Sequence, residues 1–136
     1  MKKEPVFRGV CTALITPFRE TSIDFDTMEA LIERQITAGV AALAVCGTTG
    51  ENATLTDAEH KRLIRFAVER VRGRVPLIAG TGSNDTTHAI EMSRYAADLG
   101  VDALLTVTPY YNKTSQEGLY RSFTAIADAV NCPMIL

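Results

Sequence analysis

Short apolar segments alternate with amphipathic segments along the whole chain. Each apolar segment is almost continuously apolar, which is typical of strands covered on both faces in a parallel sheet. The segments begin near Val10, Ala41, Val75, Val101 and Met134. We therefore predict a strand at each of these positions, with a helix after each of the first four.

The amphipathic segments carry sequence signals for the start and the end of a helix. A capping box predicts a start, and a glycine or proline just beyond the apolar stripe predicts an end. The predicted starts are Asp26 with Glu29 as its box partner, Thr56 with Glu59, a position near Asn84, and Thr114 with Glu117. The corresponding ends are Gly39, Gly73, Gly100 and a position before Pro133.

Strict alternation of strand and helix leaves two architectures, a closed (β/α)8 barrel and an open doubly wound sheet. An open sheet would normally carry a phosphate-binding loop, and residues 80–85 lack the third glycine of the G-x-G-x-x-G motif. Polar, glycine-bearing segments follow the predicted strands, where a barrel enzyme has its active site. We therefore predict that residues 1–136 form one partial α/β domain, the amino-terminal half of a (β/α)8 TIM barrel with four βα units and the start of strand five.

Composition excludes several classes of function. A net charge of −2, with 22% charged residues, gives no reason to expect nucleic acid or a membrane surface as a partner. No apolar run is long enough for a signal peptide or a transmembrane helix, so we expect a cytoplasmic protein. Neither His60 nor His88 has a second ligand at metal spacing, and we expect no metal or cofactor.

Cys46 stands at the end of an apolar run, beside a polar turn. A catalytic thiol is conceivable there, but no histidine is positioned by the sequence to activate it. Free cysteine is among the most buried residue types, so we favour a buried strand cysteine.

Two polar clusters are candidates for chemistry. The sequence Gly-Thr-Thr-Gly-Glu at 47–51 follows a predicted strand, where backbone N–H groups and threonine hydroxyls can bind a small anion such as a carboxylate. The alternative is a structural turn whose hydroxyls bond to the local backbone. The second cluster, at 106–113, contains the adjacent pair Tyr110 and Tyr111. A tyrosine hydroxyl beside a threonine hydroxyl can pass a proton, and this favours an active site.

These residues also carry a resemblance. Residues 47–51 with 53–55, residues 79–82, the run Thr-Pro-Tyr-Tyr-Asn-Lys at 108–113 and the opening segment 13–18 resemble the 4-hydroxy-tetrahydrodipicolinate synthase family. The similarity extends over essentially the whole chain. It implies a (β/α)8 barrel enzyme, usually a homotetramer built as a dimer of dimers. It also implies condensation of pyruvate with aspartate β-semialdehyde in diaminopimelate and lysine biosynthesis, through an imine between pyruvate and an active-site lysine.

The resemblance assigns roles to three residues. Thr49 would bind the pyruvate carboxylate, Thr48 would stand in the middle of a proton relay, and Tyr111 would be the relay member supplied by a neighbouring subunit. The family's second relay tyrosine is expected directly after Leu136, and its arginine and its imine-forming lysine further on. Lys61, on the exposed side of the second helix, and Lys113, in a loop, do not match that lysine. The chain by itself is therefore expected to be inactive.

The resemblance also points to a regulatory site. Lysine-sensitive relatives bind lysine at a dimer cleft, and the matching positions are Ala53, Asn84, His88 and Tyr110. His88 replaces a glutamate, and an imidazole is a weaker partner for the inhibitor's ammonium group, or a repulsive one when protonated. Tight lysine inhibition is therefore not expected. An ordinary exposed helix histidine is the alternative interpretation of His88.

Two other functions stay open from the sequence. One is a sister pyruvate-dependent aldolase such as an N-acetylneuraminate lyase, because the Gly-Thr-Thr-Gly-Glu turn is shared with that class. The other is a non-catalytic half-barrel unit for folding or assembly. A half-barrel leaves strand edges and apolar surface uncovered, so we expect the isolated chain to self-associate or to be poorly soluble.

Overall fold

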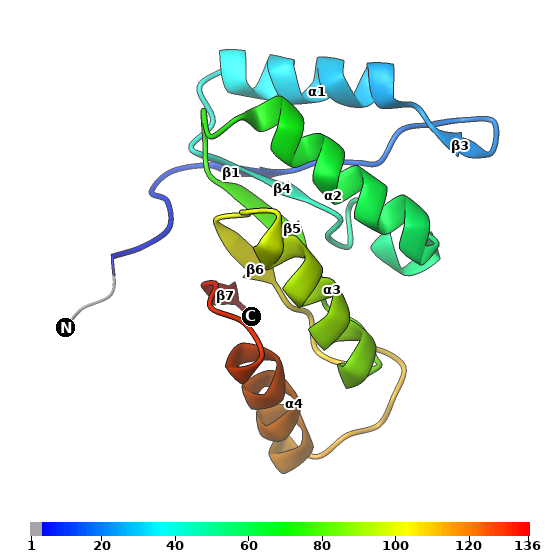
Figure 1. Ribbon diagram of the computed structural model, residues 1–136, viewed down its shortest axis with the longest axis vertical. Helices are drawn as coiled ribbons and strands as arrows, with labels where there is room; N and C mark the ends of the chain where they lie inside the picture. Colours follow the sequence, from blue (N-terminus) through cyan, green and yellow to red (C-terminus); the bar gives the residue numbers. More distant parts are fainter. Residues whose placement is uncertain (1–3) are drawn as a thin grey trace.

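The computed structural model describes residues 4–136, which fold around a five-stranded parallel sheet (Figure 1). In spatial order the strands are β1 (Cys11–Ala13), β4 (Ala42–Val45), β5 (Leu77–Gly80), β6 (Ala103–Leu105) and β7 (Met134–Ile135). Adjacent strands in the sheet thus follow one another along the chain, and every pairing is parallel. These are the strands that the apolar pattern predicts.

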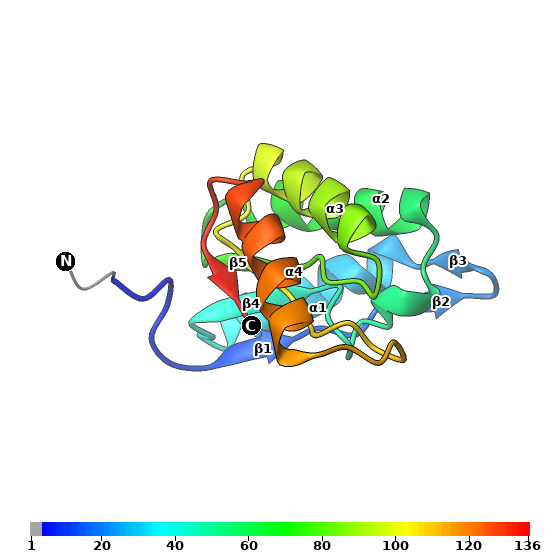
Figure 2. The same cartoon turned by 90° about the horizontal axis from the view of Figure 1, so that it is seen from below.

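A helix follows each of the first four strands of this sheet. The helices are α1 (Phe25–Thr37), α2 (Asp57–Val71), α3 (Thr86–Asp98) and α4 (Gln116–Asp128). Figure 2 shows α2, α3 and α4 side by side against one side of the sheet, and each helix packs on the next. In a doubly wound sheet the strand order would reverse and helices would cover both faces. The half-barrel prediction is therefore confirmed.

The two faces of the sheet carry side chains of different size. The strand residues on the helix side are mainly large, with Leu43, Leu77 and Leu104 in one core shared with the helices. The opposite face gathers Ala42, Ala44, Ile78 and Ala103, against which Val6 and Phe7 pack. This period-2 division is hidden in the sequence because both sets are apolar.

Two of the four predicted helix starts agree with the structure and two are wrong. Thr56 and Glu59 form the predicted capping box of α2. The box predicted at Asp26 is wrong, because α1 is capped by Asp24, whose carboxylate accepts from the Thr27 N–H at 3.1 Å. The box predicted at Thr114 is also wrong, because Ser115 caps α4 and accepts from the Gly118 N–H at 3.1 Å. The third helix is capped by Asp85, one residue beyond the expected position near Asn84.

A β-hairpin between β1 and α1 was not predicted from the sequence. After β1 the chain forms a short antiparallel hairpin, β2 (Phe18–Arg19) and β3 (Ser22–Ile23), before entering α1. Each strand has only two residues, too few for an alternating pattern to stand out.

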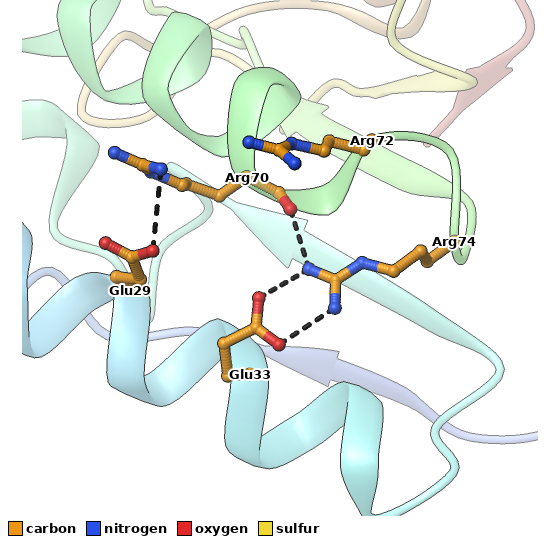
Figure 3. Close-up of a pocket in the computed structure, with 5 residues that line it drawn as sticks. All are labelled: Glu29, Glu33, Arg70, Arg72 and Arg74. Carbon is orange, nitrogen blue, oxygen red and sulfur yellow. Dashed lines mark hydrogen bonds and ion pairs between the residues drawn. The ribbon is translucent and has the colours of Figure 1, made fainter.

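Charged side chains form a cluster at the amino end of the sheet, where α2 returns to β5. Arg74 makes a bidentate ion pair with Glu33 of α1, and a guanidinium nitrogen of Arg70 lies 3.5 Å from a Glu29 carboxylate oxygen (Figure 3). Hydrogen bonding from Arg74 lowers the pKa of Glu33. These pairs hold the end of α2 on α1, around an open cavity of about 280 Å³.

No helix within residues 4–136 is both long enough and apolar enough to cross a membrane.

Candidate active site at the carboxyl end of the sheet

The polar segments singled out in the sequence meet at the carboxyl end of the sheet. Because all strands of the sheet run parallel, the loops that follow them emerge at one edge. These loops are residues 47–51 after β4, residues 81–84 after β5 and residues 106–113 after β6. The Asn112 side-chain amide donates to the Asn84 carbonyl at 2.8 Å and joins the last two.

The turn at residues 47–51, called the 47–51 turn below, is fixed by backbone and side-chain bonds. The Gly50 N–H donates to the Gly47 carbonyl at 3.0 Å, and the Glu51 N–H donates to the Thr48 carbonyl at 3.0 Å. The buried Thr16 hydroxyl, from the loop after β1, donates to the Gly50 carbonyl at 2.7 Å. The turn is therefore closed by its own backbone bonds and is held at Gly50 by the loop after β1.

Thr48 and Thr49 lie on the exposed side of this turn. Within residues 4–136, neither hydroxyl has a hydrogen-bond partner, and neither backbone N–H donates to a carbonyl. A turn whose threonines only satisfied the local backbone would use these groups internally. Up to four donors are thus free for a ligand, which favours the anion-binding interpretation.

Cys46 precedes the turn and is buried, with 1% of its surface exposed. Burial raises the pKa of its thiol to about 12, so the reactive thiolate is not populated near neutral pH. The prediction of a buried cysteine is confirmed for Cys46, and the catalytic-thiol alternative is wrong.

The threonine pair and the tyrosine pair lie at the same end of the sheet. Thr48 and Tyr110 line one cavity of about 400 Å³, together with Glu51, Val107 and the 3-10 turn η1 (Asn52–Thr54). Tyr111 does not line it. Its side chain is 99% exposed and its backbone is left-handed, with φ of 68°.

A second cavity, of about 210 Å³, opens between the amino ends of α2 and α3. Its wall includes Ala53, His88 and Tyr110, three of the four positions named for a regulatory site. The fourth, Asn84, does not line it. Asp57, which the sequence did not single out, lies in the wall and its carboxylate is 2.9 Å from His88 Nε2. His88 is therefore half-buried and paired with α2, unlike an ordinary exposed helix histidine.

His60 is a site residue that sequence reasoning missed. Its side chain is 4% exposed, and its Nε2 lies 2.8 Å from the Gly80 carbonyl oxygen at the end of β5. Burial is the main cause that lowers the pKa of its imidazole. The signal was present, because His60 continues the apolar stripe of Leu63 and Ile64 on α2.

Neither lysine of the described chain lines the Thr48 cavity. Lys61 is half-buried, against the prediction of an exposed position, with its ammonium 5.7 Å from the centre of the Tyr95 ring. Lys113 is exposed in the loop after β6. Within residues 4–136, no three His, Cys, Asp or Glu side chains gather where they could hold a metal ion.

Comparison with known proteins gives consistent matches. The sequence profile of the Dihydrodipicolinate synthetase family matches residues 6–136. A 4-hydroxy-tetrahydrodipicolinate synthase from Acetivibrio thermocellus is 52% identical over 134 residues, which are 98% of this chain. Dihydrodipicolinate synthase from Aquifex aeolicus superposes with a TM-score of 0.92 at 47% identity, over 94% of this chain. The chloride-inhibited dihydrodipicolinate synthase from Acinetobacter baumannii, solved with pyruvate, gives 0.91 at 46% identity over the same share.

The chain spans less than half the length of these proteins. It covers 46% of the Acetivibrio relative and 44% of each of the two solved chains. The structural match is therefore to half of a complete barrel.

Proposed function

The chain belongs to the dihydrodipicolinate synthetase family, and from that premise we propose that it carries part of the active site of a 4-hydroxy-tetrahydrodipicolinate synthase. Such an enzyme condenses pyruvate with aspartate β-semialdehyde on the route to diaminopimelate and lysine. The observation that carries the proposal is the set of free donors on Thr48 and Thr49, on the turn at the edge of a cavity that Thr48 shares with Tyr110. The pyruvate found in the Acinetobacter relative supports the choice of ligand.

Thr49 is the proposed partner of the pyruvate carboxylate. A carboxylate needs several donors held in one place, and the backbone N–H and hydroxyl of an anchored turn supply them without adding a charge. The bond from Thr16 to Gly50 keeps the turn in position before the ligand arrives. The donors are thus preorganised, which lowers the entropic penalty of binding.

Thr48 and Tyr111 are the proposed members of a proton relay. An imine between pyruvate and a lysine draws electrons from the neighbouring carbon, so that this carbon can lose a proton and attack the aldehyde. Hydroxyl groups can carry the proton in both directions. Tyr111 projects away from its own chain, which supports a role in the site of a second subunit of a homo-oligomer.

The imine-forming lysine is proposed to lie outside residues 1–136. Of the two lysines within residues 4–136, Lys113 is solvated and Lys61 is held beside Tyr95, away from the Thr48 cavity. The 136-residue chain alone is therefore proposed to be inactive, with catalysis belonging to a longer protein or an assembly.

Weak lysine inhibition is proposed for the same protein. In the second cavity the Asp57 carboxylate is already paired with His88, so it is less available for the ammonium group of a ligand. Isothermal titration of lysine into the complete enzyme tests this proposal. Micromolar binding would contradict it.

A chimaera tests the main proposal. Residues 1–136 are joined in register to the carboxyl-terminal remainder of the Acetivibrio thermocellus synthase, then incubated with pyruvate and borohydride. Mass spectrometry should find one pyruvate adduct per chain of the chimaera, and none on the 136-residue chain. An adduct on the short chain would overturn the proposed place of the lysine.

The chimaera is also assayed with aspartate β-semialdehyde, and Thr49→Val serves as the matched variant. We expect the variant to raise the pyruvate concentration needed for half-maximal trapping by about ten- to a hundredfold, because a charge-assisted bond is lost. A folded chimaera that binds no pyruvate would instead favour the non-catalytic assembly unit.

A further inference from the structure

His60 lies beneath the 47–51 turn, and we propose that it is a positioning residue which sets the place of Thr48 and Thr49 through the Gly80 backbone. The consequence for catalysis rests on the function proposed above. The placement itself rests only on contacts among His60, Gly80 and the turn.

The first contact is the bond from His60 to Gly80. A carbonyl oxygen can only accept a hydrogen bond, so at 2.8 Å the Nε2 atom of His60 must carry the proton. The imidazole is 4% exposed and sits in the first turns of α2, whose start is fixed by the Thr56–Glu59 capping box. The donor therefore has one tautomer and little freedom to move.

The second contact is between Gly80 and the peptide that leads into the turn. A Cβ atom at Gly80 would lie 2.0 Å from the Cys46 carbonyl oxygen and 2.8 Å from the Gly47 nitrogen. The Gly80 backbone is thus in direct contact with the Cys46–Gly47 peptide. A shift of Gly80 would have to be followed by that peptide, because both are main chain and neither can rotate away.

The third contact completes the path to the threonines. The Gly47 carbonyl accepts the Gly50 N–H at 3.0 Å and so closes the turn on which Thr48 and Thr49 stand. His60 therefore controls one edge of the turn, and Thr16 controls the other through Gly50. No part of this path uses the free donors themselves, which stay available for a ligand.

Hydrogen exchange measured by mass spectrometry tests the proposal on the 136-residue chain, at submicromolar concentration to limit self-association. His60→Leu removes the donor, whereas His60→Gln keeps an N–H at a similar distance. Leu63→Ala is the control, because it opens a cavity on the same buried face of α2 and leaves the hydrogen bond from His60 to Gly80 in place.

In His60→Leu, the amides of residues 50–52, which are hydrogen-bonded within the turn, should exchange about tenfold faster or more relative to those of α3, since a buried carbonyl loses its partner. His60→Gln should stay within about threefold of the parent chain. Leu63→Ala should accelerate the two regions alike. Equal patterns in His60→Leu and Leu63→Ala, or an unchanged 50–52 segment, would overturn the proposal.

A second measurement guards against a variant that does not fold. Long-range ¹H–¹⁵N spectra of the chimaera, labelled with ¹⁵N in histidine only, should show His60 as the Nε2–H tautomer, and the Nδ1–H tautomer would contradict the bond to Gly80. Neither experiment contains pyruvate. Failure of the proposed function would therefore leave both results unchanged, and failure of this inference would leave the trapping experiment unchanged.

Discussion

The two ends of the sheet differ in whether their polar side chains have partners within the chain. At the amino end, Arg74 and Glu33 satisfy each other, and Arg70 pairs with Glu29 (Figure 3). At the carboxyl end, the donors of Thr48 and Thr49 have no partner within residues 4–136. In barrel folds the first kind of end supports stability and the second kind holds the site. Pairing of charged side chains within the chain, more than the number of polar residues, distinguishes the two, although the buried Nε of Arg70 has no partner among the described residues.

The two ends of the sheet also differ in backbone conformation. Among the non-glycine residues with positive φ, Glu20 lies in the β2–β3 hairpin, and Cys46, Tyr111 and Glu51, which caps η1, lie in or beside the loops of the site. At the amino end, Arg72 is also left-handed, but it caps the end of α2, which is a common use of that conformation. Three of the five non-glycine residues with positive φ in residues 4–136 thus lie in or beside the loops where a ligand is proposed to bind.

The largest expected effect comes from Gly80→Ala, at the carboxyl end. The added Cβ would meet the Cys46 carbonyl oxygen at 2.0 Å, and neither backbone can yield. We expect a loss of more than about 3 kcal/mol of unfolding free energy, or no folded protein. Circular dichroism during thermal unfolding measures it.

Gly100→Ala is the control at the amino end. Gly100 has φ of 85° and nothing within 4 Å of an added Cβ, so only conformational strain remains. A loss of about 1–2 kcal/mol is expected. Equal losses in the two variants would show that crowding at Gly80 is unimportant.

The next effect concerns the exposed tyrosine. In the chimaera, Tyr111→Phe should lower kcat by about 10²- to 10⁴-fold, because the relay loses a hydroxyl. Its stability should change by less than about 0.5 kcal/mol, since the side chain is exposed on its own chain.

Tyr120→Phe is the matched variant for this experiment. Tyr120 is also exposed, on α4, and we expect no change of kcat. Steady-state kinetics with both substrates gives the answer. If the two variants behave alike, Tyr111 has no role in the relay.

A smaller effect is expected from the titration of His60. Its pKa is lowered in the folded protein, chiefly by burial, so the unfolded chain takes up the proton first as the pH falls. Stability from this group is complete above about pH 6.5 and is lost as the pH falls through the folded pKa. His60→Gln should flatten this part of the profile of unfolding free energy against pH. A profile that keeps its slope in the variant would assign it to other groups.

The smallest effect is expected at the amino end. Glu33→Gln breaks the pair with Arg74, but both side chains are exposed to solvent. The expected loss is smaller than that of any stability variant above, and it should shrink in high salt. Denaturant unfolding at two salt concentrations measures it. A larger or salt-independent loss would mean that the amino end contributes more than this comparison allows.

The sequence was sufficient for the architecture and for locating the polar loops at the carboxyl end of the sheet. Continuous apolar strands, glycine stops and polar segments after the strands predict the half-barrel, because each signal is local. The 47–51 turn and the tyrosine pair were found in the same way. Their catalytic and binding roles stay predictions.

Contacts between residues far apart in the chain could not be predicted from the sequence. His60 and Gly80 are 20 residues apart, and Asp57 and His88 are 31 apart, so no local pattern links them. The predictions of the caps of α1 and α4 were wrong for a different reason. Several Asp, Ser and Thr residues near a helix start can each accept the free N–H groups, and loop geometry decides which one does.

The strands β1 and β7 each have a partner on one side only among the described residues. Two copies that joined at both edges would bring together about ten strands, whereas the closed barrel of this class has about eight. A symmetric pair therefore cannot complete the ring without releasing a strand from each copy. Pairing along one edge at a time would leave another edge free and would extend into open-ended stacks. Light scattering of the 136-residue chain should accordingly show species that grow with concentration, and a uniform monomer at high concentration would contradict this.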